Sequence, residues 1–283
     1  MPRPARPEAI LAVLCAGVVT LSGCLPDLPT HPTTRGTTSA ATGSTAADPS
    51  PSQSPSGRPS TPPPSPGASG IPSTAATVAG VDVSRYQPTV DWAGLWATGH
   101  RFAWVKATEG TTHVSPTYAA QRSGALGVGM LVGGYHYARP AASSGAAQAR
   151  HFLTYGGGWT SDGRTLPGAL DLEAATTGDP CHGLNPSQVA RWVRDFSDTY
   201  RATTGRAPLI YVRADMWDRC LGADSSFGST NPLWLYDHDG PMGPLPAGWD
   251  RPTFWQRGVD GNLDRNVFLG TEPQLRAWAT SGS

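Results

Sequence analysis

Two acidic side chains stand two residues apart in a short apolar run, Ala169-Leu170-Asp171-Leu172-Glu173. If this run is a β-strand, Asp171 and Glu173 point to the same side, with their Cα atoms about 6.6 Å apart. Repulsion and desolvation in a shared cleft raise one carboxyl pKa, which leaves a proton donor beside an anion. Cleavage of a glycosidic bond uses this combination. The alternative is an ion pair with an arginine, which would not explain why further acids cluster at other strand ends.

Three more acids accompany apolar runs elsewhere in the chain. Asp82 lies within Val81-Asp82-Val83, Glu109 follows the run that ends at Thr108, and Asp264 follows the seventh predicted strand. An isolated carboxylate in an apolar strand is costly unless it is paired or functional. Barrel enzymes place their sites at the carboxyl ends of the strands, so we expect these acids to meet there.

Aromatic residues occur near the same strand ends. Each could offer its face to a sugar ring or pack in the core, and the sequence does not decide between the two. His136, on the third predicted strand, is more simply explained as a hydrogen-bonded core imidazole than as a catalytic group. The aromatic residues concerned are Tyr135, Tyr137, Trp234 and Trp255.

Short apolar runs alternate with helical patterns over the last 205 or so residues, which predicts a parallel sheet. The clearest helix follows Asn185-Pro186, a cap and a first-turn proline, and ends at Gly205. Other helices are predicted at 115–126, 143–154 and 272–280. Strands are predicted at 79–83, 102–107, 130–137, 169–172, 209–212, 233–236 and 253–256, with an eighth near 259–267. A full (β/α)8 barrel does not fit this length easily, so some late helices should be missing.

Composition divides the chain into two parts. All 24 aromatic residues lie between Tyr86 and Trp278, and 44 of the 54 residues from 25 to 78 are Pro, Ser, Thr, Gly or Ala. Such a segment cannot form a packed core, so we interpret 24–78 as a disordered tether and 79–283 as the folded domain. The 21 basic and 21 acidic side chains balance, which argues against a nucleic-acid partner.

The first 23 residues have the pattern of a secretory signal. Arg3 and Arg6 precede an apolar run, 9–21, that is too short to span a bilayer. The run ends in Leu21-Ser22-Gly23-Cys24, which resembles the bacterial lipobox. That resemblance implies that Cys24 is lipidated and anchors the protein to the outer face of the cell membrane. The alternative is an ordinary signal peptide and a secreted protein.

The remaining cysteines fit an exported protein. Cys15 would be removed with the signal, which leaves Cys181 and Cys220 as one pair and suggests a disulfide. A zinc site needs more ligands at closer spacing, and we expect neither a metal nor an organic cofactor.

Six sequence blocks, taken together and in order, resemble glycoside hydrolase family 25, the Chalaropsis-type lysozymes, over about residues 79–280. The Cys181/Cys220 pair also resembles a disulfide of the secreted bacterial branch of that family. The blocks are Gly80-Val81-Asp82-Val83-Ser84 with Tyr86-Gln87-Pro88, Val105-Lys106-Ala107-Thr108-Glu109-Gly110, Gly134-Tyr135-His136-Tyr137-Ala138, Leu170-Asp171-Leu172-Glu173, Phe254-Trp255-Gln256 and Asp264-Arg265-Asn266-Val267-Phe268.

This resemblance implies an α/β fold, an irregular TIM-like (β/α)5(β)3 barrel, that hydrolyses the β-1,4 bond between N-acetylmuramic acid and N-acetylglucosamine in peptidoglycan. Glu173 would be the general acid, and Asp171 would orient the 2-acetamido group of the substrate, which attacks as the internal nucleophile. Asp82 would complete the catalytic set. Substrate-binding positions would be Asp264, Tyr135, Trp255 and Glu109. An older interpretation of the same motifs pairs Asp82 with Glu109, but the shared strand face favours Asp171 and Glu173. Glu109 would instead be held by Lys106, the only lysine of the chain.

The chain also departs from the family pattern. Ala174 stands where the family often has a larger residue, and Tyr236, followed by Asp237, stands where a small residue is usual. Tyr236 could narrow the cleft, which keeps a non-catalytic peptidoglycan-binding module of the same fold as an alternative. A chitin hydrolase is disfavoured, because Pro167-Gly168-Ala169-Leu170 precedes the acid pair where chitinase-like barrels carry more acids.

We expect the protein to be a monomer.

Overall fold

The computed structural model describes residues 76–238 and 240–281. The expected signal peptide (1–23), Cys24 and nearly all of the expected tether (24–78) lie outside the described residues. The first strand begins at Val78, one residue before the expected domain boundary.

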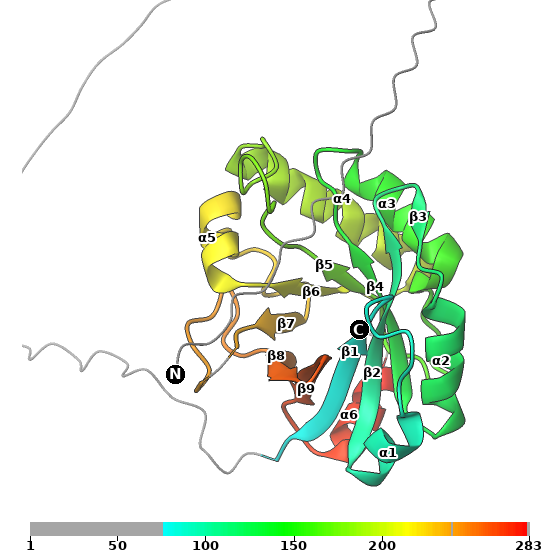
Figure 1. The fold of residues 1–283 in the computed structure, drawn as a ribbon. Helices are drawn as coiled ribbons and strands as arrows, with labels where there is room; N and C mark the ends of the chain where they lie inside the picture. Colours follow the sequence, from blue (N-terminus) through cyan, green and yellow to red (C-terminus); the bar gives the residue numbers. More distant parts are fainter. Residues whose placement is uncertain (1–75, 239, 282–283) are drawn as a thin grey trace, which may run out of the picture. The chain divides into compact units, whose positions relative to one another are not determined.

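Eight strands of the described region close into a barrel (Figure 1). Closure comes from the first strand, which pairs with both the second strand and the last. A short ninth strand, β3 (His113–Val114), extends the sheet beside the end of β2. The barrel strands are β1 (Val78–Val83), β2 (His100–Glu109), β4 (Leu131–Tyr137), β5 (Ala169–Asp171), β6 (Leu209–Val212), β7 (Leu233–Tyr236), β8 (Phe254–Asp260) and β9 (Leu263–Phe268).

The first seven barrel strands run parallel, and β9 runs antiparallel to both of its neighbours. A helix connects each of the first five of these strands to the next one, and among the described residues none connects β7 to β8 or β8 to β9. This is the (β/α)5(β)3 order that the resemblance implied. The helices are α1 (Trp92–Ala97), α2 (Tyr118–Gly127), α3 (Gly145–Phe152) with the π turn η1 (Leu153–Gly157), α4 (Pro186–Thr204), α5 (Ala214–Leu221) and, after β9, α6 (Glu272–Thr280).

The predicted eighth strand, 259–267, is wrong in its bounds. The strand predicted at 253–256 continues as β8 to Asp260, and the chain then reverses through Gly261 and Asn262 into β9. Gly261 has φ +61°, a left-handed conformation that glycine adopts at no steric cost. The hairpin therefore falls in the middle of the expected strand.

The predicted helices are confirmed with small shifts, and two short helices, α1 and α5, were not predicted. The Asn185 side chain accepts from the backbone of Gln188, and Gly205 ends α4 with φ +75°. The helix expected from 115 begins only at Tyr118, because the amide of Ser115 pairs with the carbonyl of Ala107. Helices of six and eight residues show too few turns to reveal a periodic pattern.

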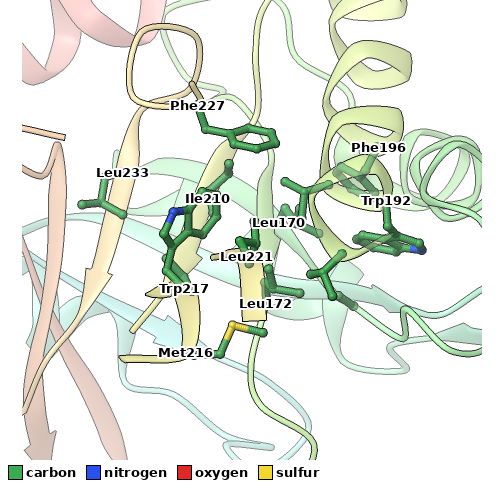
Figure 2. Close-up of a cluster of buried hydrophobic side chains, with 14 of the residues drawn as sticks. Leu170, Leu172, Trp192, Phe196, Ile210, Met216, Trp217, Leu221, Phe227 and Leu233 are labelled. Carbon is green, nitrogen blue, oxygen red and sulfur yellow. The ribbon is translucent and has the colours of Figure 1, made fainter. Parts of the chain in front are cut away.

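Strand alternation divides the core into an inner and an outer layer. Large aromatic side chains fill the barrel interior, among them Phe102, Trp104, Trp234 and Phe254. The outer layer lies between the β5–β7 side of the barrel and its helices (Figure 2). Its labelled members are Leu170, Leu172, Trp192, Phe196, Ile210, Met216, Trp217, Leu221, Phe227 and Leu233. Each strand therefore sends alternate side chains into the barrel and onto the helices.

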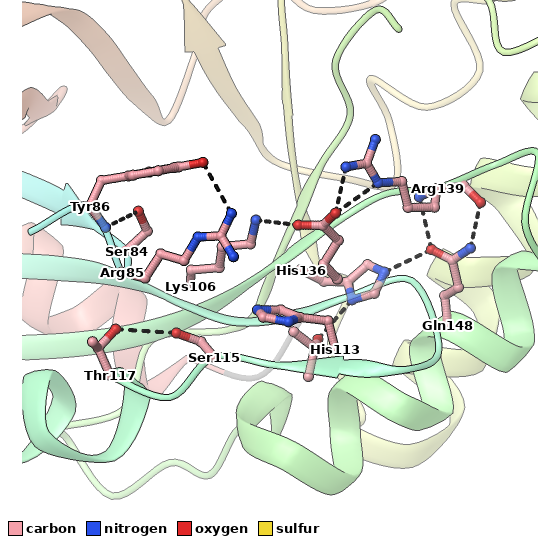
Figure 3. Close-up of polar contacts among 12 residues, drawn as sticks. Ser84, Arg85, Tyr86, Lys106, His113, Ser115, Thr117, His136, Arg139 and Gln148 are labelled. Atoms are coloured by element: carbon pink, nitrogen blue, oxygen red, sulfur yellow. Dashed lines mark hydrogen bonds and ion pairs between the residues drawn. The ribbon is translucent and has the colours of Figure 1, made fainter. Parts of the chain in front are cut away.

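His136 belongs to the outer layer. It is fully buried, its Nδ1 lies 2.8 Å from the hydroxyl of Thr108, and its Nε2 donates to Oε1 of Gln148 at 2.9 Å (Figure 3). Burial lowers its pKa to about 4, so the ring is neutral at physiological pH. The expectation of a hydrogen-bonded core imidazole is confirmed.

Cys181 and Cys220 form the expected disulfide, with their Cα atoms 5.2 Å apart. The bond ties the loop after β5 to the last turn of α5. Within residues 76–238 and 240–281, every helix is too short or too polar to cross a bilayer.

Candidate active site

A cavity of about 490 Å³ opens at the carboxyl ends of the parallel strands. Because β9 runs antiparallel to its neighbours, its first residues lie at the same end of the barrel. The side chains around the cavity are predominantly acidic, basic and aromatic. Those discussed below are Asp82, Lys106, Glu109, Tyr135, Tyr137, Arg139, Asp171, Glu173, Tyr211, Trp234, Tyr236, His238, Gln256 and Asp264.

Asp171 and Glu173 both line this cavity, as the strand geometry predicted. Asp171 is the last residue of β5 and is only 6% exposed, whereas Leu172 between the two acids is buried in the outer layer. The register places Asp171 between Tyr137 of β4 and Tyr211 of β6. The pair is therefore held by a central strand with tyrosines on both sides.

Burial raises the pKa of both carboxyl groups. For Asp171 the pKa lies well above its usual range, because desolvation is reinforced by the charge of Glu173. Desolvation also raises the pKa of Glu173, against the opposing charge of Lys106. The two carboxyl groups interact, so they titrate as a pair and not as independent acids. The sequence argument expected a protonated Glu173 beside an ionised Asp171, and that assignment stays a prediction.

Asp82 is anchored from below by two amides. Its Oδ1 accepts hydrogen bonds from Nε2 of Gln256 (2.8 Å) and from Nδ2 of Asn266 (2.6 Å). Burial raises the pKa of Asp82 to about 7, and the carboxylates of Asp264 and Glu173 act in the same direction. Asp82 is therefore held in one orientation and retains a proton well into the neutral range.

The anchoring amide of Gln256 is itself fixed by two donors. Its Oε1 accepts from the hydroxyl of Tyr211 at 2.9 Å and lies 2.8 Å from Nε2 of His238, which must donate because an amide oxygen only accepts. This network joins β1, β6 and β8. Asp264 lies opposite Asp82 in the β1–β9 register, and burial raises its pKa while His238 lowers it.

Glu109 also lines the cavity but is held by two cations. Nζ of Lys106 donates to Oε2 at 2.6 Å, and Nε of Arg139 donates to Oε1 at 2.8 Å (Figure 3). Burial would raise its pKa, but these hydrogen bonds and charges outweigh burial and lower it. A carboxylate held in its ionised form is a poor proton donor, which argues against a catalytic Asp82/Glu109 pair.

The expected aromatic contacts divide by strand face. Tyr135, Tyr137 and Trp234 line the cavity. Trp255 does not: it packs against the outer layer, and its indole N–H donates to the carbonyl of Asp237 at 2.7 Å. Its neighbour Gln256 takes the inward position instead.

Sequence reasoning missed several residues of the cavity. Tyr211 and His238 were given no role, although Tyr211 stands beside Asp171 in the register of adjacent strands. Arg139 was also missed, since its partner Glu109 lies thirty residues away. Alternation along β6 gives a signal for Tyr211, because Ile210 and Val212 face the outer layer. No local pattern points to Arg139.

The three residues that depart from the family pattern differ in their positions. Tyr236 lines the cavity and stacks on Tyr211, with ring centroids 5.7 Å apart. The carboxylate of Asp237 turns away to accept from the backbone amide of Gly243 at 2.6 Å. Ala174 does not line this cavity, so of the three only Tyr236 does.

A closed α/β barrel with two buried carboxyl groups at the end of one strand is the arrangement expected of a glycoside hydrolase. Residues 81–264 match the sequence profile of the glycosyl hydrolases family 25, and the chain belongs to this family.

Similar proteins include the N,O-diacetylmuramidase of Chalaropsis sp, 44% identical over 210 residues that cover 69% of this chain and all of that protein. Lysozyme M1 of Streptomyces globisporus is 40% identical over 218 residues, which cover 74% of each chain. Among solved structures, the family GH25 lysozyme of Aspergillus fumigatus superposes with a TM-score of 0.71 at 41% identity, covering 73% of this chain and all of that one.

Proposed function

We propose that this protein is a lysozyme that cleaves the β-1,4 bond between N-acetylmuramic acid and N-acetylglucosamine in peptidoglycan. The observation that carries the proposal is the Asp171/Glu173 pair, in which two buried carboxyl groups with raised pKa values face one cavity. The named muramidases and lysozymes among its relatives support the same substrate.

The first step uses the shared proton of the pair. The substrate's acetamido N–H donates a hydrogen bond to Asp171. This hydrogen bond stabilises the ionised form of Asp171, so the proton of the pair passes to Glu173. Glu173 then protonates the glycosidic oxygen as the bond to the leaving sugar breaks. The acetamido oxygen attacks the anomeric carbon and forms a cyclic oxazolinium ion, whose positive charge Asp171 balances.

The second step returns the proton. Glu173, now ionised, takes a proton from water, whose oxygen attacks the anomeric carbon and opens the ring of the intermediate. Two inversions at one carbon give net retention of configuration. Asp82 and Asp264 lie below the sugar at the bottom of the cleft. Glu109, whose carboxylate is held by Lys106 and Arg139, lies at the rim of the cleft.

Release of reducing ends from purified peptidoglycan tests the proposal. The Glu173→Gln variant is expected to lose at least a hundredfold in rate, because it cannot transfer a proton. The matched control is Glu272→Gln, which replaces a surface glutamate that pairs with Arg101 and Arg276 outside the cavity. The rate of the parent should fall as the pH rises above the raised pKa of Glu173, because Glu173 then lacks the proton that it transfers to the leaving oxygen.

Product analysis identifies the bond, because a muramidase leaves N-acetylmuramic acid at the new reducing end. A parent protein that binds peptidoglycan without releasing reducing ends would contradict the proposal. That result would instead favour the non-catalytic module, with Tyr236 as the residue that narrows the cleft.

We further propose that the protein is exported and tethered. Arg3, Arg6 and the apolar run 9–21 support a signal peptide, and Cys24 supports a lipid anchor on the outer face of the membrane. A Pro-rich chain of 54 residues spans about 40 Å as a coil and about 170 Å when extended, so it would let the enzyme reach the cell wall.

A further inference from the structure

A second, smaller cavity of about 250 Å³ lies directly beside the acid pair. It shares Glu173, Tyr211 and Tyr236 with the main cleft, so the two spaces adjoin at the proposed proton donor. The volume is equivalent to about eight water molecules, which is room for a short amino-acid segment. The proposed mechanism does not use this space.

Stacked groups form the wall between the two cavities. The rings of Tyr211 and Tyr236 lie nearly parallel, with an interplanar angle of 15°, and the guanidinium of Arg213 stands 5.3 Å from the centre of the Tyr236 ring. A packed stack of this kind is a fixed surface and gives the small cavity a defined shape.

The floor of the small cavity is apolar. Leu172 and Cys220 are fully buried, and Met216 is nearly so. Ala174 lies at the border and is exposed, so its small side chain leaves the entrance open. Methyl and methylene groups of a ligand would gain favourable burial on this floor.

The rim of the small cavity is charged and carries two arginines and two acids. Arg213 is paired with Asp215, Nε to Oδ1 at 2.9 Å. Arg219 is exposed and forms no ion pair with any residue that the structure describes. Glu173, at the inner end, shares its proton with Asp171. The rim therefore suits a carboxylate on Arg219, and Asp215 could accept from a backbone amide.

We propose that this cavity receives the peptide stem of the muramic acid residue at the bond that is cut. The inference rests on the proposed function, which directs the acetamido group on C2 of that sugar to Asp171. The stem is attached through a lactyl ether at C3, the ring carbon next to C2, so it leaves the sugar near Asp171 and the acid pair that borders the small cavity. A stem that begins with alanine and an acidic residue carries the methyl groups and carboxylates that the floor and rim suit.

The test compares two substrates made from one peptidoglycan preparation: soluble glycan strands that carry stems, and the same strands after an amidase has removed them. The full chain is expected to prefer stem-bearing strands in kcat/KM. Arg219→Ala should reduce this preference about three- to tenfold, the loss of one charge-assisted hydrogen bond. Ala174→Leu, which narrows the entrance from an exposed position, should reduce it as well.

The matched control is Arg191→Ala, which removes an exposed arginine of α4 that lines neither cavity. It should retain the preference of the parent. An equal preference in the parent and in Arg219→Ala would overturn the inference, and so would a parent without any preference.

A binding measurement separates this inference from the proposed function. Lactyl-alanyl-glutamate, the stem fragment without the sugar, is titrated into the Glu173→Gln chain with and without Arg219→Ala. Binding that weakens with Arg219→Ala supports the stem cavity even if the parent cuts neither strand, a result that would refute the proposed function alone. Absence of binding in this titration would contradict the stem cavity even if the parent is an active lysozyme.

Discussion

At the scale of single residues, burial raises the pKa of the acids around the cavity, and the groups beside each acid reinforce or oppose that rise. Asp82 and Asp171 lie deep and have raised pKa values, whereas the pKa of Glu109, which has two cationic partners, is lowered. A carboxyl group thus favours its protonated form in one position and its ionised form in another. Such groups cost stability and persist because the surrounding fold holds them.

Replacing Asp82 by Asn is expected to stabilise the protein above neutral pH. The folded pKa of about 7 exceeds the ordinary value of 3.8, so the folded state keeps a proton that the unfolded state has lost. The contribution of Asp82 to the free energy of unfolding therefore decreases as the pH rises from about 4 to about 7. The variant should be more stable than the parent by about 2–4 kcal/mol at pH 8 and should match it near pH 4.

Urea denaturation of both proteins at pH 4, 6 and 8 measures this difference. Asp162→Asn is the control of opposite sign, because hydrogen bonds from Arg164 and Thr165 lower the pKa of that exposed carboxyl group. A constant difference between Asp82→Asn and the parent across this range would show that Asp82 does not titrate as inferred.

At the scale of elements, the site depends on short strands supported by long connections. The strand β5 has only three residues, yet it carries Asp171 and leads directly to Glu173. The loop that follows β5 is tied to α5 by the Cys181–Cys220 disulfide. Residues of this loop also line the small cavity. The disulfide therefore connects the element that carries the acids to the element that carries Arg219.

Removing this disulfide with Cys181→Ser and Cys220→Ser should lower the free energy of unfolding by about 2–4 kcal/mol. A sequence separation of 39 residues gives a large loss of chain entropy in the unfolded state when the bond is present. Urea denaturation checks the value. The reduced parent should behave like the double variant, and a double variant as stable as the oxidised parent would contradict the expectation.

At the scale of the whole molecule, an enzyme of about 205 residues follows a segment that composition marks as a tether. If Cys24 carries lipid, a Cys24→Ser variant should move from the membrane fraction to the soluble fraction of the host bacterium. Cys15→Ser is the matched control, because Cys15 lies within the signal run and should leave the distribution unchanged. Equal fractionation of the parent and Cys24→Ser would support an ordinary signal peptide instead.

Much of the barrel could be predicted because its signals are local. Apolar runs marked seven strands, and the cap at Asn185 with the glycine at 205 marked α4. The β8–β9 hairpin was misplaced although Asp260, Gly261 and Asn262, inside the predicted strand, are residue types that favour a turn. Alternation along β8 separates Gln256, which faces the cavity, from Trp255, which does not, but the resemblance drew attention to the aromatic residue.

The sequence by itself determined the positions of the acids along their strands, because a period of two puts Asp171 and Glu173 on one face. It could not determine how the pKa of each acid is shifted. That depends on depth of burial and on groups brought in from distant strands, such as Arg139 beside Glu109 and Gln256 and Asn266 beside Asp82. The small cavity also exists only in the folded chain, where the segment after β5, the ends of β6 and β7, and α5 meet. Local spacing sets the direction of a side chain, but pKa and cavity shape arise from long-range contacts, so only the tertiary structure decided them.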